Sequence, residues 1–104
     1  MTTIRLEFDR QFIPHILSGT KRVTFRRGAK GNAGDFFPIE YLGVKYLYHI
    51  TDVQPMCLSV FCDNYFDEDG FKSPYDAREY FARHYGDPHD FCVTEGFLHR
   101  FERV

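Results

Sequence analysis

The stretch that decides the fold is Gly19-Thr20-Lys21-Arg22-Val23-Thr24-Phe25-Arg26-Arg27. It follows a short apolar segment, residues 12–18, which stops at the first glycine. The stretch then alternates: Val23 and Phe25 point to one face of an extended strand, and Thr24, with an arginine two residues away on either side, points to the other. The pattern predicts a strand with one apolar and one basic face. An ordinary solvent-exposed face of an antiparallel sheet has the same pattern.

Within this stretch, Gly19-x-Lys21-x-x-Thr24-x-Arg26 resembles the signature of the ASCH family, a small β-barrel related to the PUA RNA-binding domain. The family usually carries Gly-x-Lys-x-x-Glu-x-Arg, so Thr24 stands where most members have Glu. The same Thr appears in the family's small bacterial 4-acetylcytidine amidohydrolases, which are the most similar group. Two further pieces fit in order: Gly34-Asp35 resembles the Gly-Asp that opens the next strand, and Asp69-Gly70-Phe71 resembles an acidic-Gly-Phe turn before a helix.

The length and composition indicate one domain over residues 1–104. The chain is 43% hydrophobic with 12 Phe and no Trp, so Phe and Tyr must supply the aromatic bulk of the core. The net charge of −2 argues against a protein that coats nucleic acid nonspecifically, because phosphate neutralisation needs a basic surface. We therefore expect no DNA partner, although a small basic pocket is compatible with this charge.

The sequence also predicts a cytoplasmic protein without a membrane partner. No stretch approaches the roughly 18 apolar residues of a membrane span, and the N-terminal residues have no signal-peptide pattern. The chain has three cysteines, Cys57, Cys62 and Cys92. Because their number is odd and they are not closely spaced, we expect reduced thiols instead of disulfides.

Hydrophobic periodicity predicts the elements along the chain. Strands are expected over residues 3–8, 22–26, 36–41, 44–50 and 91–104, with a turn at 51–55 and an element of undecided type at 56–61. In the last strand Val93, Phe97 and Phe101 are expected to face inward, with a bulge at Gly96. A short helix is expected before Gly19, and another starts at Ser73 and stops at Gly86, with an inward stripe that includes Ala77, Phe81, His84 and Tyr85.

This order predicts a mixed, mainly antiparallel sheet with helices at its ends. The ASCH resemblance makes the expectation specific. It implies an α+β, mainly β fold, a PUA-like barrel of about five to six strands with two short helices.

The candidate catalytic residues are Lys21, Thr24 and an acid. A threonine hydroxyl needs a base, and a neutral lysine amine can serve if burial or a nearby like charge lowers its pKa from roughly 10.4. In a regular strand residues three apart face opposite sides, so the pair meets only if Lys21 lies in the turn before the strand. The resemblance implies that Lys, Thr and Glu carry deacetylation of 4-acetylcytidine. The position matching that Glu is Asp69, one methylene shorter, and Glu68 is the alternative acid.

Other side chains are candidates for substrate binding. The guanidinium of Arg26 can donate two hydrogen bonds to a carbonyl, a developing oxyanion or a phosphate. Arg22 and Arg27 belong to the same basic stretch and are further candidates. Tyr48 is a candidate for stacking on a base, although tyrosines more often belong to the core or surface. The glycine-rich loop of residues 27–34 is either a phosphate cradle or simply mobile.

No metal or cofactor is expected, because His84, His89 and Cys92 lack the spacing of a known metal site.

The leading functional hypothesis is an amidohydrolase that removes an acyl group from a modified pyrimidine nucleoside such as 4-acetylcytidine. The alternative is an RNA-binding module or a ribonuclease that uses the same basic residues. The partner is therefore a small nucleoside or RNA, and the sequence leaves the oligomeric state open.

Overall fold

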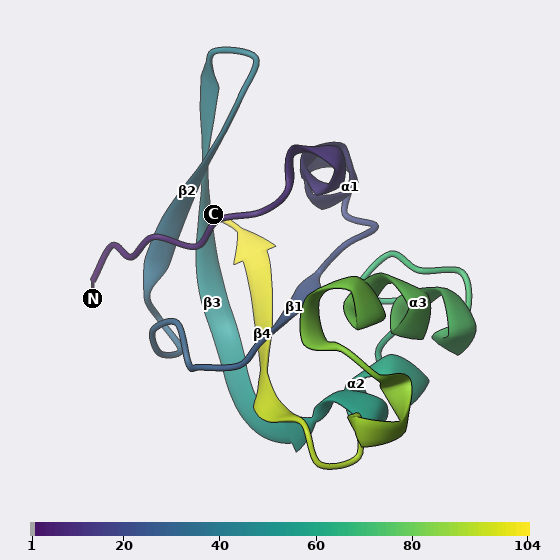
Figure 1. Cartoon of the computed structure of the whole chain (residues 1–104). Helices are drawn as coiled ribbons and strands as arrows, with labels where there is room; N and C mark the ends of the chain where they lie inside the picture. Colours follow the sequence, from purple (N-terminus) through teal and green to yellow (C-terminus); the bar gives the residue numbers. More distant parts are fainter. Residues whose placement is uncertain (1) are drawn as a thin grey trace.

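The computed structural model describes residues 2–104 and is built around one curled antiparallel sheet (Figure 1). The strands lie in the order β1-β4-β3-β2, so β1 and β2 are the edges. Their bounds are β1 Val23–Arg26, β2 Phe36–Tyr41, β3 Val44–Cys57 and β4 Glu95–Arg103. The α-helices are α1 Ile13–Leu17, α2 Leu58–Asn64 and α3 Pro74–Tyr85, and 3₁₀ turns span Arg10–Phe12 and Pro88–Asp90. The mainly β, α+β fold is confirmed, with four strands instead of five to six and three α-helices instead of two.

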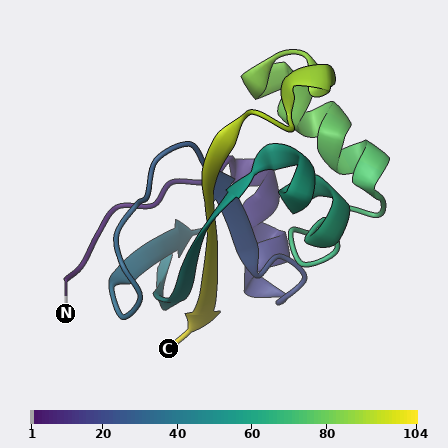
Figure 2. The ribbon, with the colours of Figure 1, turned by 90° about the horizontal axis from the view of Figure 1, so that it is seen from below.

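Helices α2 and α3 gather at one end of the sheet, the β2–β3 hairpin projects at the other, and α1 lies apart from the other two helices (Figure 1). Both views place α2 and α3 side by side beyond the end of β3 (Figure 2). Within residues 2–104 no helix is long and apolar enough to cross a membrane.

The predicted strand at residues 3–8 is wrong. This segment makes a single parallel bridge, Thr3 with Phe36, in which the Ile4 N–H donates to the Phe36 carbonyl. The next bond of such a ladder would come from the backbone nitrogen of Pro38, which has no hydrogen. The segment therefore leaves the edge of β2 and crosses the molecule as an irregular chain.

The predicted turn at residues 51–55 is also wrong, because β3 runs through it. The pairing of β3 with β4 shifts between Ile50 and Asp52, so Thr51 is left outside the register. Such a bulge bends a strand without ending it. Residues 56–61, left undecided by periodicity, divide between the end of β3 and the start of α2.

The core consists of two aromatic clusters on either side of β1 and β4. One packs α2 and α3 against the sheet and includes Phe25, Phe61 and Phe81; the other packs α1 and residues 4–8 against β2 and β3. On α3 the predicted Ser73 cap is present, since the Asp76 N–H donates to Ser73 Oγ at 3.1 Å. The predicted inward stripe holds for Ala77 and Phe81 and fails for the exposed His84.

The last strand begins later than predicted, at Glu95, which leaves Val93 exposed. Phe101 is buried and Phe97 is half-buried. Gly96 pairs regularly with Met56 instead of forming a bulge. A glycine is needed there because a Cβ atom would lie 2.3 Å from Phe25 Cζ and 2.6 Å from the Arg26 carbonyl oxygen.

We predict that Gly96→Ala lowers the free energy of unfolding by about 1–3 kcal/mol, the usual effect of overpacking a core. Gly28→Ala is the matched control, because a Cβ there meets nothing within 4 Å. Urea unfolding of the two variants tests this, and equal stability would contradict the packing role of Gly96.

Candidate functional site

Lys21 lies in the turn between α1 and β1. Its backbone N–H donates to the His15 carbonyl at 3.0 Å, and Gly19, with φ 85°, reverses the chain just before it. Since β1 begins only at Val23, Lys21 is free of the alternation that would have turned it away from Thr24. Its Nζ donates to the Val23 carbonyl at 3.0 Å, which directs the side chain into the molecule.

The Lys21 ammonium meets the Asp69 carboxylate in a buried contact between Nζ and Oδ1. Only 4% of Lys21 and 2% of Asp69 are exposed. Asp69 is presented by the turn between α2 and α3, where its N–H donates to the Tyr65 carbonyl at 3.0 Å. Two segments distant in the sequence therefore meet at one ion pair.

The environment of Lys21 changes its acidity. Burial, and after it the positive charge of Arg26, lower the pKa of the Lys21 amine to about 7. An ionised Asp69 carboxylate acts in the opposite sense, because it favours the charged amine. The protonation of Lys21 therefore depends on both its burial and the charge of its carboxylate neighbour.

The pair lines a pocket of about 330 Å³ together with Thr24 from β1. Arg26, at the end of the same strand, donates through Nη2 to the Glu7 carbonyl. Aromatic rings cover the cations: Lys21 Nζ lies 5.2 Å from the ring centre of Phe12, and Arg26 Cζ lies 5.1 Å from that of Phe8. The full lining is Glu7, Phe8, Asp9, Phe12, Lys21, Thr24, Arg26, Asp69, Tyr80 and Phe81.

Two of the predicted residues lie near this pocket but point elsewhere. Glu68 is the neighbour of Asp69, yet its carboxylate binds Arg100 through both Nη atoms and lies 3.8 Å from Arg22. Arg22 itself is exposed. The choice between Asp69 and Glu68 thus falls on Asp69 by position, because Asp69 alone of the two lines the pocket.

Two other predicted residues are not part of the pocket lining. Arg27 donates from Nε to the Glu95 carbonyl at 3.0 Å and lines a separate hollow beside Cys57. Tyr48 is 3% exposed in the second core cluster, with its hydroxyl near the Ile16 carbonyl at 3.4 Å. It packs within the core and does not offer a stacking face.

Sequence reasoning missed the residues that cover the pocket, namely Phe8, Asp9, Phe12 and Tyr80. Phe8 and Asp9 come from the irregular segment before the Arg10–Phe12 turn, and Phe12 comes from that turn itself. Tyr80 is the neighbour of Phe81 on α3 and packs against the same cluster. The predicted apolar stripe of that helix could therefore have indicated that Tyr80 lies near the pocket.

Several backbone amides of the glycine-rich loop of residues 27–34 are already used within the fold. The Asn32 N–H donates to Asp35 Oδ2 at 2.8 Å, and the Lys30 N–H donates to His99 Nε2 at 2.9 Å. His99 is completely buried on β4, and burial lowers its pKa. In residues 2–104 no group of three potential ligands is placed to hold a metal ion.

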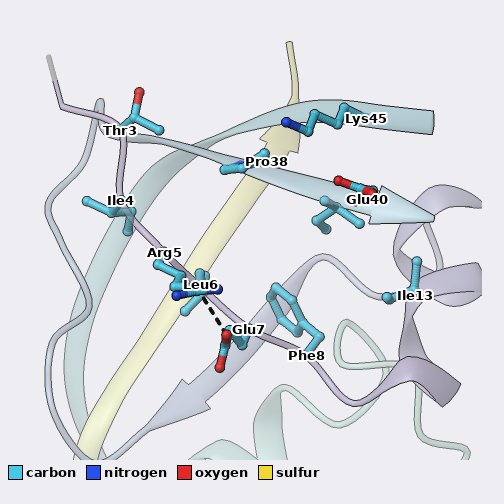
Figure 3. A pocket seen from close by; sticks show the side chains of 11 residues that line it. Thr3, Ile4, Arg5, Leu6, Glu7, Phe8, Ile13, Pro38, Glu40 and Lys45 are labelled. Atoms are coloured by element: carbon cyan, nitrogen blue, oxygen red, sulfur yellow. Dashed lines mark ion pairs between the residues drawn. The ribbon is translucent and has the colours of Figure 1, made fainter. Parts of the chain in front are cut away.

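A larger cavity, of about 700 Å³, lies between residues 3–8 and the β2–β3 hairpin (Figure 3). Its charged side chains include Arg5 and Glu7, which pair with each other at 3.1 Å and are largely exposed. It holds no buried acid or base, so the Lys21 pocket is the better candidate site.

Comparison with solved structures agrees with the expected fold. Hypothetical protein PH0355 is 15% identical with a TM-score of 0.72, and each chain is covered completely. An ASCH domain from Lactobacillus crispatus JV V101 is 14% identical with a TM-score of 0.62, covering 98% of this chain and 78% of that one. Protein PF0455 from Pyrococcus furiosus is 14% identical with a TM-score of 0.59, covering 100% and 98%. The chain therefore has the ASCH fold.

No family model matches the chain, and no curated protein matches it by sequence.

We predict that Asp69→Asn lowers the free energy of unfolding by roughly 3–5 kcal/mol at pH 6, because it leaves a buried ammonium without its counter-charge. The loss becomes smaller at pH 9, where an amine with a pKa of about 7 is neutral. Glu68→Gln, the matched control on a half-buried ion pair, loses about 1 kcal/mol or less. Denaturant unfolding at both pH values tests this, and equal losses for the two variants would refute it.

We also predict that the His99 contact makes stability depend on pH. The folded pKa lies below that of the unfolded chain, so the unfolded state binds the proton more readily. This contribution is complete above roughly pH 6.5 and is lost as the pH falls below it. His99→Gln should therefore lose less stability than the wild type between pH 7.5 and 5.5. His15→Gln, an exposed control, should follow the wild type, and an unchanged slope in His99→Gln would contradict the assignment.

Proposed function

We propose that this protein is an amidohydrolase that removes the acyl group from an acylated pyrimidine nucleoside, such as 4-acetylcytidine, or from a similar small amide. The observation that carries the proposal is the shared pocket of Lys21, Thr24, Arg26 and Asp69. These are the residues to which the resemblance to the ASCH amidohydrolases points. At the position of the acid, this chain has Asp69 where those proteins have the longer Glu.

The proposed chemistry begins with proton transfer to Lys21. The neutral amine accepts the Thr24 hydroxyl proton while Thr24 Oγ1 bonds to the acyl carbon. Arg26 would hold the carbonyl oxygen as negative charge develops on it. As the C–N bond breaks, Asp69 would relay the proton from Lys21 to the leaving amine. Water then cleaves the acyl-threonine ester, releases the acid and restores the hydroxyl.

The burial of Lys21 and Asp69 supports these roles. A lysine exposed to water stays charged at neutral pH and is no base, whereas this amine has a pKa of about 7. The direct contact with Asp69 gives the proton a short return path. The shorter acid does not leave a gap here, since the α2–α3 turn brings its carboxylate to the amine.

RNA binding or RNA cleavage is the alternative, and it would use a different surface. Arg22, Arg27 and Lys30 are exposed, and none of them lines the pocket. An RNA ligand held by such groups loses affinity steeply as salt rises, whereas turnover of an uncharged nucleoside barely responds to salt.

We predict that the purified protein releases cytidine from 4-acetylcytidine, measured by chromatography of the products. Lys21→Ala and Thr24→Ala should each lower kcat/KM by about 100-fold or more, the usual contribution of a general base or nucleophile. Lys45→Ala, which removes an exposed lysine on β3, is the matched control and should keep full activity. Asp69→Glu should give turnover no higher than the wild type.

Each other outcome has a definite meaning. Cytidine from both the wild type and Lys21→Ala would point to a contaminant or a different catalytic residue. Full activity of Thr24→Ala would refute the nucleophile assignment. No cytidine from any variant would favour RNA as the ligand, and a salt titration with RNA would then be decisive.

A further inference from the structure

Residues 7–12, here called the strap, border the pocket that contains Lys21, and the first two of them also border the larger cavity. Glu7 and Phe8 line both the 330 Å³ pocket that contains Lys21 and the 700 Å³ cavity on the other side (Figure 3). Buried residues anchor the chain before and after the strap, at Leu6 and Ile16. The strap thus has fixed ends and open space behind it.

Two polar contacts join the strap to the elements beneath it. Arg26 on β1 donates to the Glu7 carbonyl, and the Tyr80 hydroxyl on α3 donates to Asp9 Oδ2 at 2.9 Å. The Phe12 ring packs edge-on against the Tyr80 ring with centres 5.1 Å apart. Burial, and after it the hydrogen bond to the Asp9 carboxylate, raises the pKa of the Tyr80 hydroxyl, so this group stays a hydrogen-bond donor.

The strap is what separates Lys21 from water. The rings of Phe8 and Phe12 lie 5.9 and 5.2 Å from Lys21 Nζ. Only 4% of Lys21, 2% of Asp69 and 6% of Thr24 are exposed, so little of these residues meets water in this position of the strap. The charged and titratable groups around the amine are Asp69 from the α2–α3 turn, Arg26 from β1, Glu7 and Asp9 from the strap, and Tyr80 from α3.

We propose that Tyr80 is a positioning residue that latches the strap through Asp9, and that the strap moves outward into the 700 Å³ cavity to admit a ligand to Lys21. The closed strap keeps the amine dry, and the open strap exposes it. The inference rests on the proposed function only in taking Lys21 as the group that a substrate must reach.

The test measures access to Lys21 directly, without substrate. The protein is labelled with a trace of acetic anhydride across a range of pH, and acetylation of each lysine is quantified by peptide mass spectrometry. The exposed Lys45 serves as the internal reference. In the wild type, Lys21 should label far more slowly than Lys45.

Tyr80→Phe keeps the ring but removes the latch hydroxyl. Relative to Lys45, labelling of Lys21 should rise on the order of tenfold, as expected when one hydrogen bond to a charged group no longer favours the closed state. The midpoint of labelling against pH should also move upward from about 7, because water stabilises the ammonium. Tyr75→Phe, an exposed tyrosine on the same helix, should behave as the wild type.

Asp9→Ala removes the latch from the strap side and should give the same rise if Tyr80→Phe fails to fold. Unchanged labelling and midpoint in the folded variants would overturn the latch, as would rapid labelling of Lys21 in the wild type. Absence of cytidine release with the predicted labelling would refute the amidohydrolase but not the strap. Cytidine release with unchanged labelling would refute the strap alone.

Discussion

The buried contact between Lys21 and Asp69 is the constraint around which the site is arranged. The two residues are 48 positions apart, and each is held by a turn instead of a regular element. Around them the Arg22 N–H donates to the Glu68 carbonyl at 2.6 Å, which ties the start of β1 to the α2–α3 turn. Burying two charges is expensive, and apolar residues often stabilise a fold as well. The presence of the pair is therefore weak evidence for net stabilisation, although removing one partner alone would leave an uncompensated buried charge.

The strand β1 connects this pair to the core. Val23 and Phe25 enter the cluster formed with α2 and α3, while Thr24 and Arg26 line the pocket. Because alternate residues of one short strand serve packing and the pocket, the helices that bury Phe25 also fix the position of Thr24. Gly96 contributes from the neighbouring strand, since its missing side chain leaves room for the Phe25 ring.

The sequence predicted what depends on local pattern. Alternation located β1, and the Ser73 cap located the start of α3. The sequence did not predict effects that depend on distant residues. Pro38, in another segment, ends the pairing of residues 3–8 with β2. A bulge lets β3 continue through residues 51–55, which had been predicted to form a turn. Likewise, no local signal shows that Tyr48 is core, or that Asp69 and not Glu68 turns toward Lys21. The family signature predicted the fold and pointed to residues that line one pocket, but not to the strap.

The distribution of charge separates the two ligand classes. Inside the pocket the Lys21 and Asp69 charges oppose each other, and the carboxylates of Glu7 and Asp9 lie on its exposed side. A phosphate approaching from that side meets negative charge, whereas an uncharged amide does not. Arg26 lines the same pocket, where its Nη2 donates to the Glu7 carbonyl. For the proposed amidohydrolase, this balance of charge is an argument for an uncharged ligand in the pocket, and the exposed Arg22 and Arg27 outside the lining are the surface that the RNA alternative would use.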